Sequence, residues 1–124
     1  MSVEALSEEI RDFLLRHIGS VAHLEALLFF RARPAETLDA RSLARRLYVR
    51  ESEAIAALAE LVDDGFLAVE NGLYRYAPPM DDKARIDRVA SAYAHQLIAV
   101  TNLIHENRRN IQARRDAFRR RKER

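Results

Sequence analysis

The sequence predicts a mainly α-helical fold with one small β-hairpin, and three observations predict it. Two short amphipathic segments, residues 40–47 and 51–64, are separated by a turn at 48–50. Two strand-like runs, 66–70 and 73–76, flank Asn71-Gly72, and both turn residues tolerate the positive φ of a tight hairpin. After Pro78-Pro79 the chain contains neither glycine nor proline, which permits one long helix. This order of elements indicates a winged helix-turn-helix core with a long C-terminal helix.

The helix-turn-helix carries its own start and stop signals. Asp39 is placed to cap the first helix, and Gly65 to end the second in a left-handed conformation. The second helix has its apolar residues at helical spacing along one stripe: Ile55, Leu58, Ala59 and Val62, with Leu61 beside them. We expect the opposite face to present Ala56, Ala57, Glu60, Asp63 and Asp64 to solvent.

The two-residue hairpin turn fixes the strand register. It sets Val69 opposite Tyr74 and Leu67 opposite Tyr76, and we expect all four side chains to face the core. Leu38 is expected to add a single strand residue beside the hairpin.

Helix-breaking glycine and proline residues divide the chain into three regions. Residues 1–19 form an amphipathic N-terminal helix, with Gly19 as its break and Ser20 as the cap of the next helix. Residues 20–79 form the winged helix-turn-helix domain, and residues 80–124 form the long C-terminal helix.

The C-terminal helix repeats apolar residues in heptads, which is typical of a coiled coil. We expect it to join two copies into a homodimer, or else to fold back on the N-terminal helix. The seam residues are Ile86, Ala90, Tyr93, Leu97, Val100, Ile104, Asn107, Ile111 and Phe118. Asn107 either sets the register of the seam or is solvated.

Charge is unevenly distributed along the chain. Residues 108–124 hold nine basic and two acidic residues, a net charge of +7, whereas residues 1–107 hold twelve basic and seventeen acidic ones, a net charge of −5. The basic tail consists of Arg114, Arg115, Arg119, Arg120, Arg121 and Lys122, with Arg108 and Arg109 before it. This tail could bind phosphates or an acidic protein surface, or it could be a frayed, solvated helix end.

The chain contains no cysteine, no signal-peptide pattern and no apolar run of membrane length, so we expect a cytoplasmic protein without a membrane anchor.

Arginines around the helix-turn-helix are the candidates for binding double-stranded DNA. We expect basic residues of the two helices and the wing to hold phosphates, and Arg50 and Ser52 to reach bases. This predicted set is Arg41, Arg45, Arg46, Arg50, Ser52 and Arg75. The second helix also carries a set of carboxylates, and the alternative hypothesis is that they bind a basic protein partner. They are Glu51, Glu53, Glu60, Asp63 and Asp64.

Catalysis and cofactor binding are not indicated. The four histidines are not spaced as metal ligands, and the chain lacks a phosphate-binding glycine loop and a nucleophile motif. We therefore expect a protein that is not an enzyme and uses no metal or cofactor.

The pattern of the helix-turn-helix resembles bacterial winged-helix proteins of the MarR and PadR kind. The residues that carry the resemblance are Leu38, Leu43-Ala44, Leu47, Ile55, Leu58 and Leu61 to Leu67, within a region of about 20–77. The whole chain, through Asp116 to Lys122, also resembles small bacterial helix-turn-helix proteins of uncharacterised function. The first resemblance implies a dimeric transcriptional repressor, in some cases relieved by a small ligand. We therefore expect a dimeric DNA-binding transcriptional regulator, with the protein-interaction module as the alternative.

Overall fold

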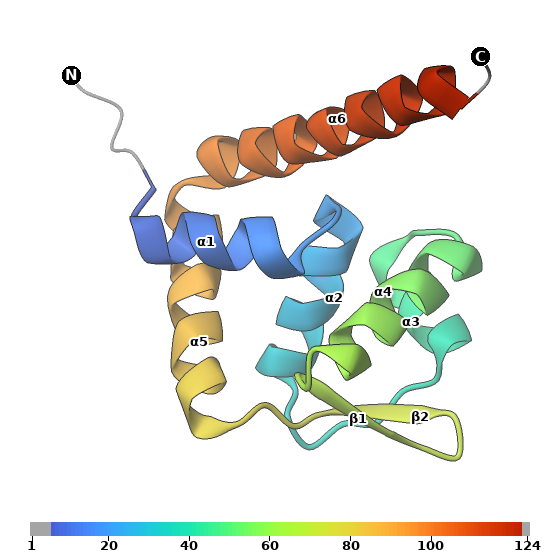
Figure 1. The fold of residues 1–124 in the computed structure, drawn as a ribbon. Coiled ribbons are helices and arrows are strands. Elements are labelled where there is room, and N and C mark those ends of the chain that lie inside the picture. The colour runs from blue at the N-terminus through green and yellow to red at the C-terminus, as the bar shows by residue number, and fades with distance from the viewer. Residues whose placement is uncertain (1–5, 123–124) are drawn as a thin grey trace.

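A computed structural model of the chain describes residues 6–122, with side chains described as far as Ile111. The described elements, in chain order, are α1 (Glu8–His17), α2 (Val21–Ala32), α3 (Ala40–Leu47), α4 (Glu51–Asp63), β1 (Leu67–Glu70), β2 (Leu73–Tyr76), α5 (Met80–His95) and α6 (Leu97–Lys122) (Figure 1). The predicted fold class is confirmed: the chain is mainly helical, with one antiparallel hairpin and the element order of a winged helix.

Local sequence signals set the ends of these elements as predicted. The Ser20 hydroxyl accepts a hydrogen bond from the backbone N–H of His23 at 3.0 Å, and the Asp39 carboxylate accepts one from Ser42 at 2.8 Å. Gly65 has a φ of 82°, where a residue without a Cβ is least strained. Asn71 and Gly72, at 53° and 76°, both have the positive φ of a type I′ hairpin turn.

The hairpin has the predicted register and a third, one-residue strand. Leu67 pairs with Tyr76 and Val69 with Tyr74, while Leu38 exchanges two backbone hydrogen bonds with Tyr74 at 2.8 and 3.1 Å. One expectation was wrong in part: Val69 is 44% exposed rather than buried. It lies near the turn, next to the exposed Glu70, at the end of the hairpin away from the buried Leu67 and Tyr76.

The core lies where α2, α3 and α4 meet, and α1 closes it from one side. Leu24, Leu27 and Phe30 of α2 are fully buried, as are Leu43 of α3 and Leu58 of α4. Phe66, directly after α4, stacks on Phe13 of α1 with ring centroids 5.5 Å apart. The N-terminal helix is therefore part of the same core as the helix-turn-helix.

The predicted orientation of α4 was wrong by about one residue. Its buried residues are Ala54, Ala57, Leu58 and Leu61, whereas Ile55 is 50% exposed and Ala59 is exposed. Because α4 packs against α2 on one side and α3 on the other, small alanines are needed where the helices approach each other closely. This rotation turns Ala57 inward and brings Ile55 to the surface.

The single long C-terminal helix was also wrong. Gln96, with φ −131° and ψ 46°, ends α5 through a hydrogen bond from its N–H to the Ala92 carbonyl, and its own carbonyl accepts from Val100 as α6 begins. Figure 1 shows α5 and α6 at a sharp angle, with α6 lying along α1 and over the end of α2, and it contacts both helices. The break places Val100 and Ile104 in the core, and the apolar area they bury offsets the lost helical hydrogen bonds.

Because the helix is broken and folded back, some residues of the predicted heptad seam are buried in the core and others are exposed. Ile86, Val100 and Ile104 are buried against their own chain, so they are not free to contact a second copy. Ala90 and Asn107 are partly buried, and the Tyr93 hydroxyl donates to Glu25 of α2 at 3.1 Å. Leu97 and Ile111 are 50% and 41% exposed. The side chains of Phe118 and of the basic tail from Arg114 to Lys122 lie outside the described residues.

Within residues 6–122, no single helix is both long enough and apolar enough to span a membrane. The pair α1 and α2 together has sufficient length and apolarity, but it is bent by 107° and its apolar residues form the core described above.

Candidate nucleic-acid interface

The turn between α3 and α4 is held by a tyrosine in a left-handed conformation. Tyr48 has φ 57° and ψ 41°, and the backbone N–H of Val49 closes the end of α3 on the Ala44 carbonyl at 3.0 Å. The Tyr48 side chain is 95% exposed. A non-glycine residue rarely adopts this conformation, and here the conformation directs a large aromatic side chain into solvent. Sequence reasoning treated Tyr48 only as a turn residue and missed it as a surface group.

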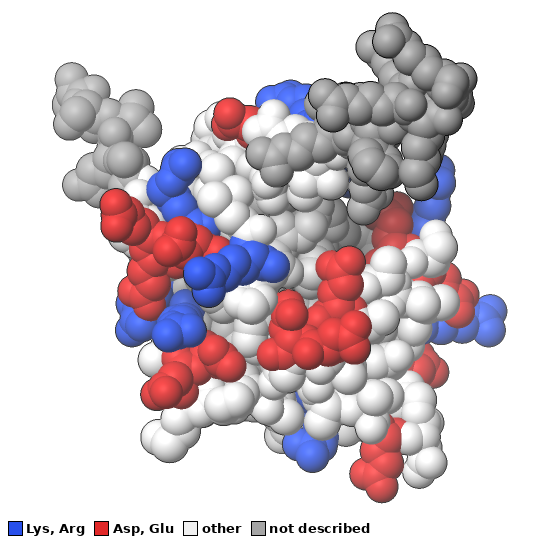
Figure 2. Space-filling view, in the orientation of Figure 1, with Lys and Arg blue, Asp and Glu red and all other residues white. Residues whose placement is uncertain are grey.

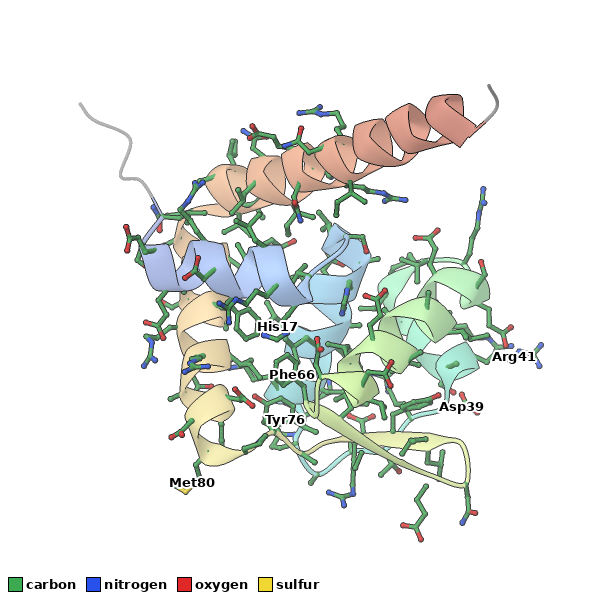
Figure 3. All side chains as sticks on the ribbon, in the orientation of Figure 1. His17, Asp39, Arg41, Phe66, Tyr76 and Met80 are labelled. Atoms are coloured by element: carbon green, nitrogen blue, oxygen red, sulfur yellow. The ribbon has the colours of Figure 1, made fainter. Side chains whose placement is uncertain are left out.

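Two arginines of α3 lie beside this tyrosine. Arg41 and Arg45 are one helical turn apart, both exposed, and both line a hollow of about 460 Å³ with Tyr48, Val49 and Glu51. Neither forms an ion pair with a carboxylate among the described residues. Figure 3 shows Arg41 extending away from the body of the protein. These two guanidinium groups are therefore available to an anionic partner.

The other predicted DNA-binding residues do not line the hollow beside Arg41 and Arg45. Arg46 is turned away: its guanidinium lies 3.3 Å from Glu36 and 5.7 Å from the centre of the Phe29 ring. It faces the loop before α3 because it lies about 100° around the helix from Arg45. Arg50 and Ser52 are exposed at the start of α4, and Arg75 is exposed on β2.

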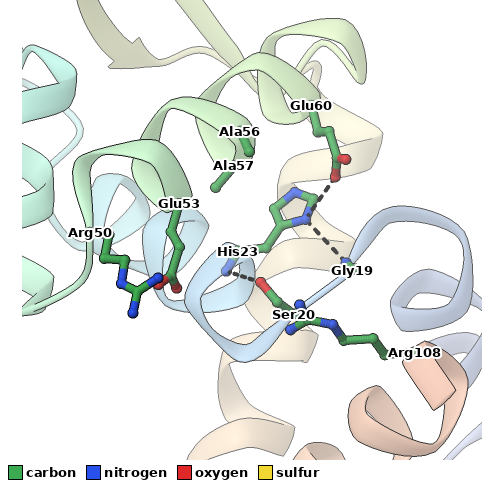
Figure 4. Close-up of a pocket in the computed structure, with 9 residues that line it drawn as sticks. All are labelled: Gly19, Ser20, His23, Arg50, Glu53, Ala56, Ala57, Glu60 and Arg108. Carbon is green, nitrogen blue, oxygen red and sulfur yellow. Dashed lines mark hydrogen bonds and ion pairs between the residues drawn. The ribbon is translucent and has the colours of Figure 1, made fainter. Parts of the chain in front are cut away.

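The first two turns of the outward face of α4 carry no charge. Opposite the buried Ala54, Ala57, Leu58 and Leu61 lie exposed small or apolar residues, Ser52, Ile55, Ala56 and Ala59, and the exposed carboxylate of Asp63 ends this line at the last residue of the helix. The carboxylates Glu53 and Glu60 are displaced to one flank, where they line a second hollow of about 500 Å³ with His23, Arg50 and Arg108 (Figure 4). Of the residues expected to face solvent, Ala57 is instead buried, because α4 is rotated by its packing against α2, whereas Glu60 is exposed as expected.

Two histidines engage the acidic flank of α4. His17 Nδ1 lies 3.0 Å from the Asp64 carboxylate, and His23 Nδ1 lies 3.1 Å from the Glu60 carboxylate. Two of the five carboxylates assigned to the alternative acidic face are thus paired within the chain. Figure 2 shows acidic side chains gathered in the middle of this face, with basic ones over α1 beside them.

His23 is buried, and its Nδ1 atom lies within 3.1 Å of both the Gly19 backbone nitrogen and the Glu60 carboxylate. Its side chain is 3% exposed, and Nδ1 accepts from the Gly19 backbone N–H at 3.1 Å while facing Glu60. Burial lowers the pKa of His23, and the nearby Glu60 opposes that shift in part. The neutral ring carries its proton on Nε2, which has no hydrogen-bond partner among the described residues. Protonation of Nδ1 would exchange the Gly19 bond for one to Glu60.

We predict that the protein becomes less stable as the pH falls below 6.5. Because burial holds the folded-state pKa of His23 below the 6.5 of an unfolded histidine, the unfolded chain takes up the proton first. The stability that His23 contributes is present above pH 6.5 and is lost as the pH falls through the folded-state pKa. Urea unfolding between about pH 7.5 and 5.5 measures this slope. His23→Gln should flatten it, whereas the exposed His105→Gln should not. An unchanged slope in His23→Gln would assign the effect to other groups.

We also predict opposite effects of one substitution on stability and on DNA binding. Tyr48→Asn should raise the free energy of unfolding by about 0.5–1 kcal/mol, because asparagine tolerates the left-handed conformation better than tyrosine. It should also weaken DNA binding, because the exposed Tyr48 hydroxyl beside Arg41 and Arg45 is placed to donate a hydrogen bond to a phosphate. Thermal unfolding and a duplex-binding assay check both parts. Tyr48→Ala is the control, since it removes the ring but leaves a strained Cβ, and should give no gain in stability.

The fold and this surface together define the chain as a winged-helix-like protein with an exposed helix-turn-helix. No protein-family model matches the chain, and no curated protein matches it. A solved structure, a possible transcriptional regulator from Methanosarcina mazei Go1, superposes with a TM-score of 0.50 and 17% sequence identity. The match covers 73% of this chain and 81% of that chain, and at this identity it shows a shared fold.

Proposed function

We propose that this chain is a DNA-binding transcriptional regulator in which α4 enters the major groove. One observation carries the proposal: the small, uncharged residues Ser52 and Ala56 on the outward face of α4 lie near the end of the helix where Arg41 and Arg45 of α3 form no ion pair, while Asp63 lies at the far end. In this arrangement Arg41 and Arg45 hold the phosphate backbone while the start of α4 meets base edges. Arg75 on the hairpin and Arg50 at the start of α4 add backbone contacts. The likeness to a possible transcriptional regulator supports this assignment.

The small side chains of α4 favour entry into a groove. Serine and alanines on the outward face let the helix backbone approach the bases closely, and Glu53 and Glu60 are kept to the flank. His17 lies 3.0 Å from the Asp64 carboxylate, whereas Glu60 faces a buried His23 whose pKa is lowered, so Glu60 keeps its negative charge on the flank at neutral pH. This acidic flank is the surface that the alternative function, binding of a basic protein partner, would use.

We further propose that the regulator acts as a homodimer through the outer side of α6. Leu97 and Ile98, at the start of this helix, are 50% and 72% exposed and lie away from the buried Leu103, which leaves an apolar surface after the rest of the seam is buried. Sedimentation should show a dimer that Ile98→Glu dissociates. Met80→Glu, at a residue that is 87% exposed on α5, is the matched control and should leave the dimer intact. A wild-type monomer at high concentration would contradict the dimer alone.

A salt titration of binding to random duplex DNA tests the proposed function. The full chain is compared with a chain that ends after Asn107, which keeps all the described buried residues as far as Ile104. Four arginine contacts predict a plot of log K against log salt with a slope of about −4. Binding that survives truncation supports the helix-turn-helix as the site. Binding lost with the tail would assign it to an arginine-rich contact, and no binding by either chain would favour a protein-interaction module.

A further inference from the structure

We infer that α4 reads thymine through its C5-methyl group, with Ile55 as a specificity-determining residue. This inference rests on the proposed function, since it concerns how the same helix would distinguish one duplex from another. It starts from the rotation of α4, which exposes Ile55 and Ala59 on the face that lies opposite the core.

The composition of α4 excludes most polar base readout. Between Glu51 and Asp63 the helix has no arginine, lysine, asparagine or glutamine, which are the side chains that bind guanine or adenine with two hydrogen bonds. Ser52 is the one hydroxyl on its outward face, and a hydroxyl bonds to several base edges without distinguishing them. We therefore expect α4 to distinguish one base from another through apolar contacts.

Thymine is the base that offers an apolar group in the major groove. Its C5-methyl group is recognised by apolar side chains, whereas cytosine presents an amino group that calls for a carboxylate. Glu53, the carboxylate near Ile55, lies on the flank in the hollow beside Ser20 and Arg108, and Asp63 lies on the outward face only at the last residue of α4, about two turns beyond Ile55.

The geometry of the outward face suits a methyl contact. Ser52, Ala56 and Ala59 lie at helical spacing along one line that ends at Asp63, and their small side chains allow the N-terminal half of the helix to sit deep in the groove. Ile55 lies beside this line and is 50% exposed, so it has free apolar surface to cover with a methyl group. The arginines Arg41 and Arg45 lie at the same end of the helix-turn-helix and complement the phosphates on either side of such a site.

The test compares two duplexes that differ only in this methyl group. Full-length protein is titrated with alternating adenine–thymine DNA and with the same duplex in which uracil replaces every thymine. We expect affinity to be about fourfold lower for uracil for each methyl group contacted, from the transfer free energy of one buried carbon group. Alternating guanine–cytosine DNA with 5-methylcytosine should likewise bind more tightly than its unmethylated form.

Matched variants assign the effect to α4. Ile55→Ala should reduce the thymine-to-uracil ratio toward one, and Leu73→Ala, at a residue that is 44% exposed on the hairpin, should leave it unchanged. Circular dichroism confirms that both variants fold. Equal affinity of the wild type for the thymine and uracil duplexes would overturn this inference while leaving DNA binding intact. A full ratio retained by Ile55→Ala would also overturn the role of Ile55, and no binding to any duplex would refute the proposed function itself.

Discussion

Replacing Arg41 and Arg45 together with glutamate should lower the affinity for duplex DNA by on the order of 100-fold at about 0.1 M salt. Both guanidinium groups are exposed on one side of α3 and make no ion pair with a described carboxylate, although the Asp39 carboxylate lies within electrostatic range of both, so they can contact phosphates. Reversing them replaces two attractions with two repulsions. The slope of log K against log salt should also become shallower by about two units, one for each lost phosphate contact.

The control for this variant carries the same change in net charge elsewhere. Arg11→Glu with Arg16→Glu alters α1, which lies on the other side of the molecule from α3 (Figure 1). It should reduce affinity only slightly, through the long-range field of the protein. Arg46→Glu should also have a small effect, because Arg46 faces Glu36 and Phe29. Equal losses in the Arg41/Arg45 and Arg11/Arg16 variants would show that binding depends on net charge rather than on this surface.

Ile104→Ala should lower the free energy of unfolding by about 2–5 kcal/mol, and the loss should not depend on protein concentration. Ile104 is 2% exposed where α6 folds back over α1 and α2, so the substitution opens a cavity within one chain. Urea unfolding at two protein concentrations that differ by about 100-fold separates this from an interface effect.

A substitution on the opposite side of α6 provides the comparison. Ile98 is 72% exposed, so Ile98→Ala should change the free energy of unfolding of the monomer by at most about 0.5 kcal/mol. If Ile104→Ala instead destabilised the protein only at low concentration, the buried part of the seam would belong to an interface between two chains. That result would contradict the fold-back of α6.

Several features of the fold follow from short stretches of sequence. The caps at Ser20 and Asp39, the end of α4 at Gly65 and the Asn71-Gly72 turn are fixed by backbone preferences and nearby hydrogen bonds. Such interactions involve residues a few positions apart, so the sequence by itself determined the order of the elements as far as the hairpin, the hairpin register and hence the winged-helix class.

The tertiary structure decided which faces of these elements are buried. A stripe that includes several alanines fits more than one rotation of α4, and only packing against both α2 and α3 selects the rotation that exposes Ile55. Likewise, no glycine or proline marks the break at Gln96, because it arises from the burial of Val100 and Ile104 against distant parts of the chain. The sequence determined that α3 is rich in arginine, but long-range contacts decided that Arg46 is paired and that Arg41 and Arg45 are free. Burial depends on residues far apart in the chain, and for that reason the surface that carries the proposed function became defined only in three dimensions.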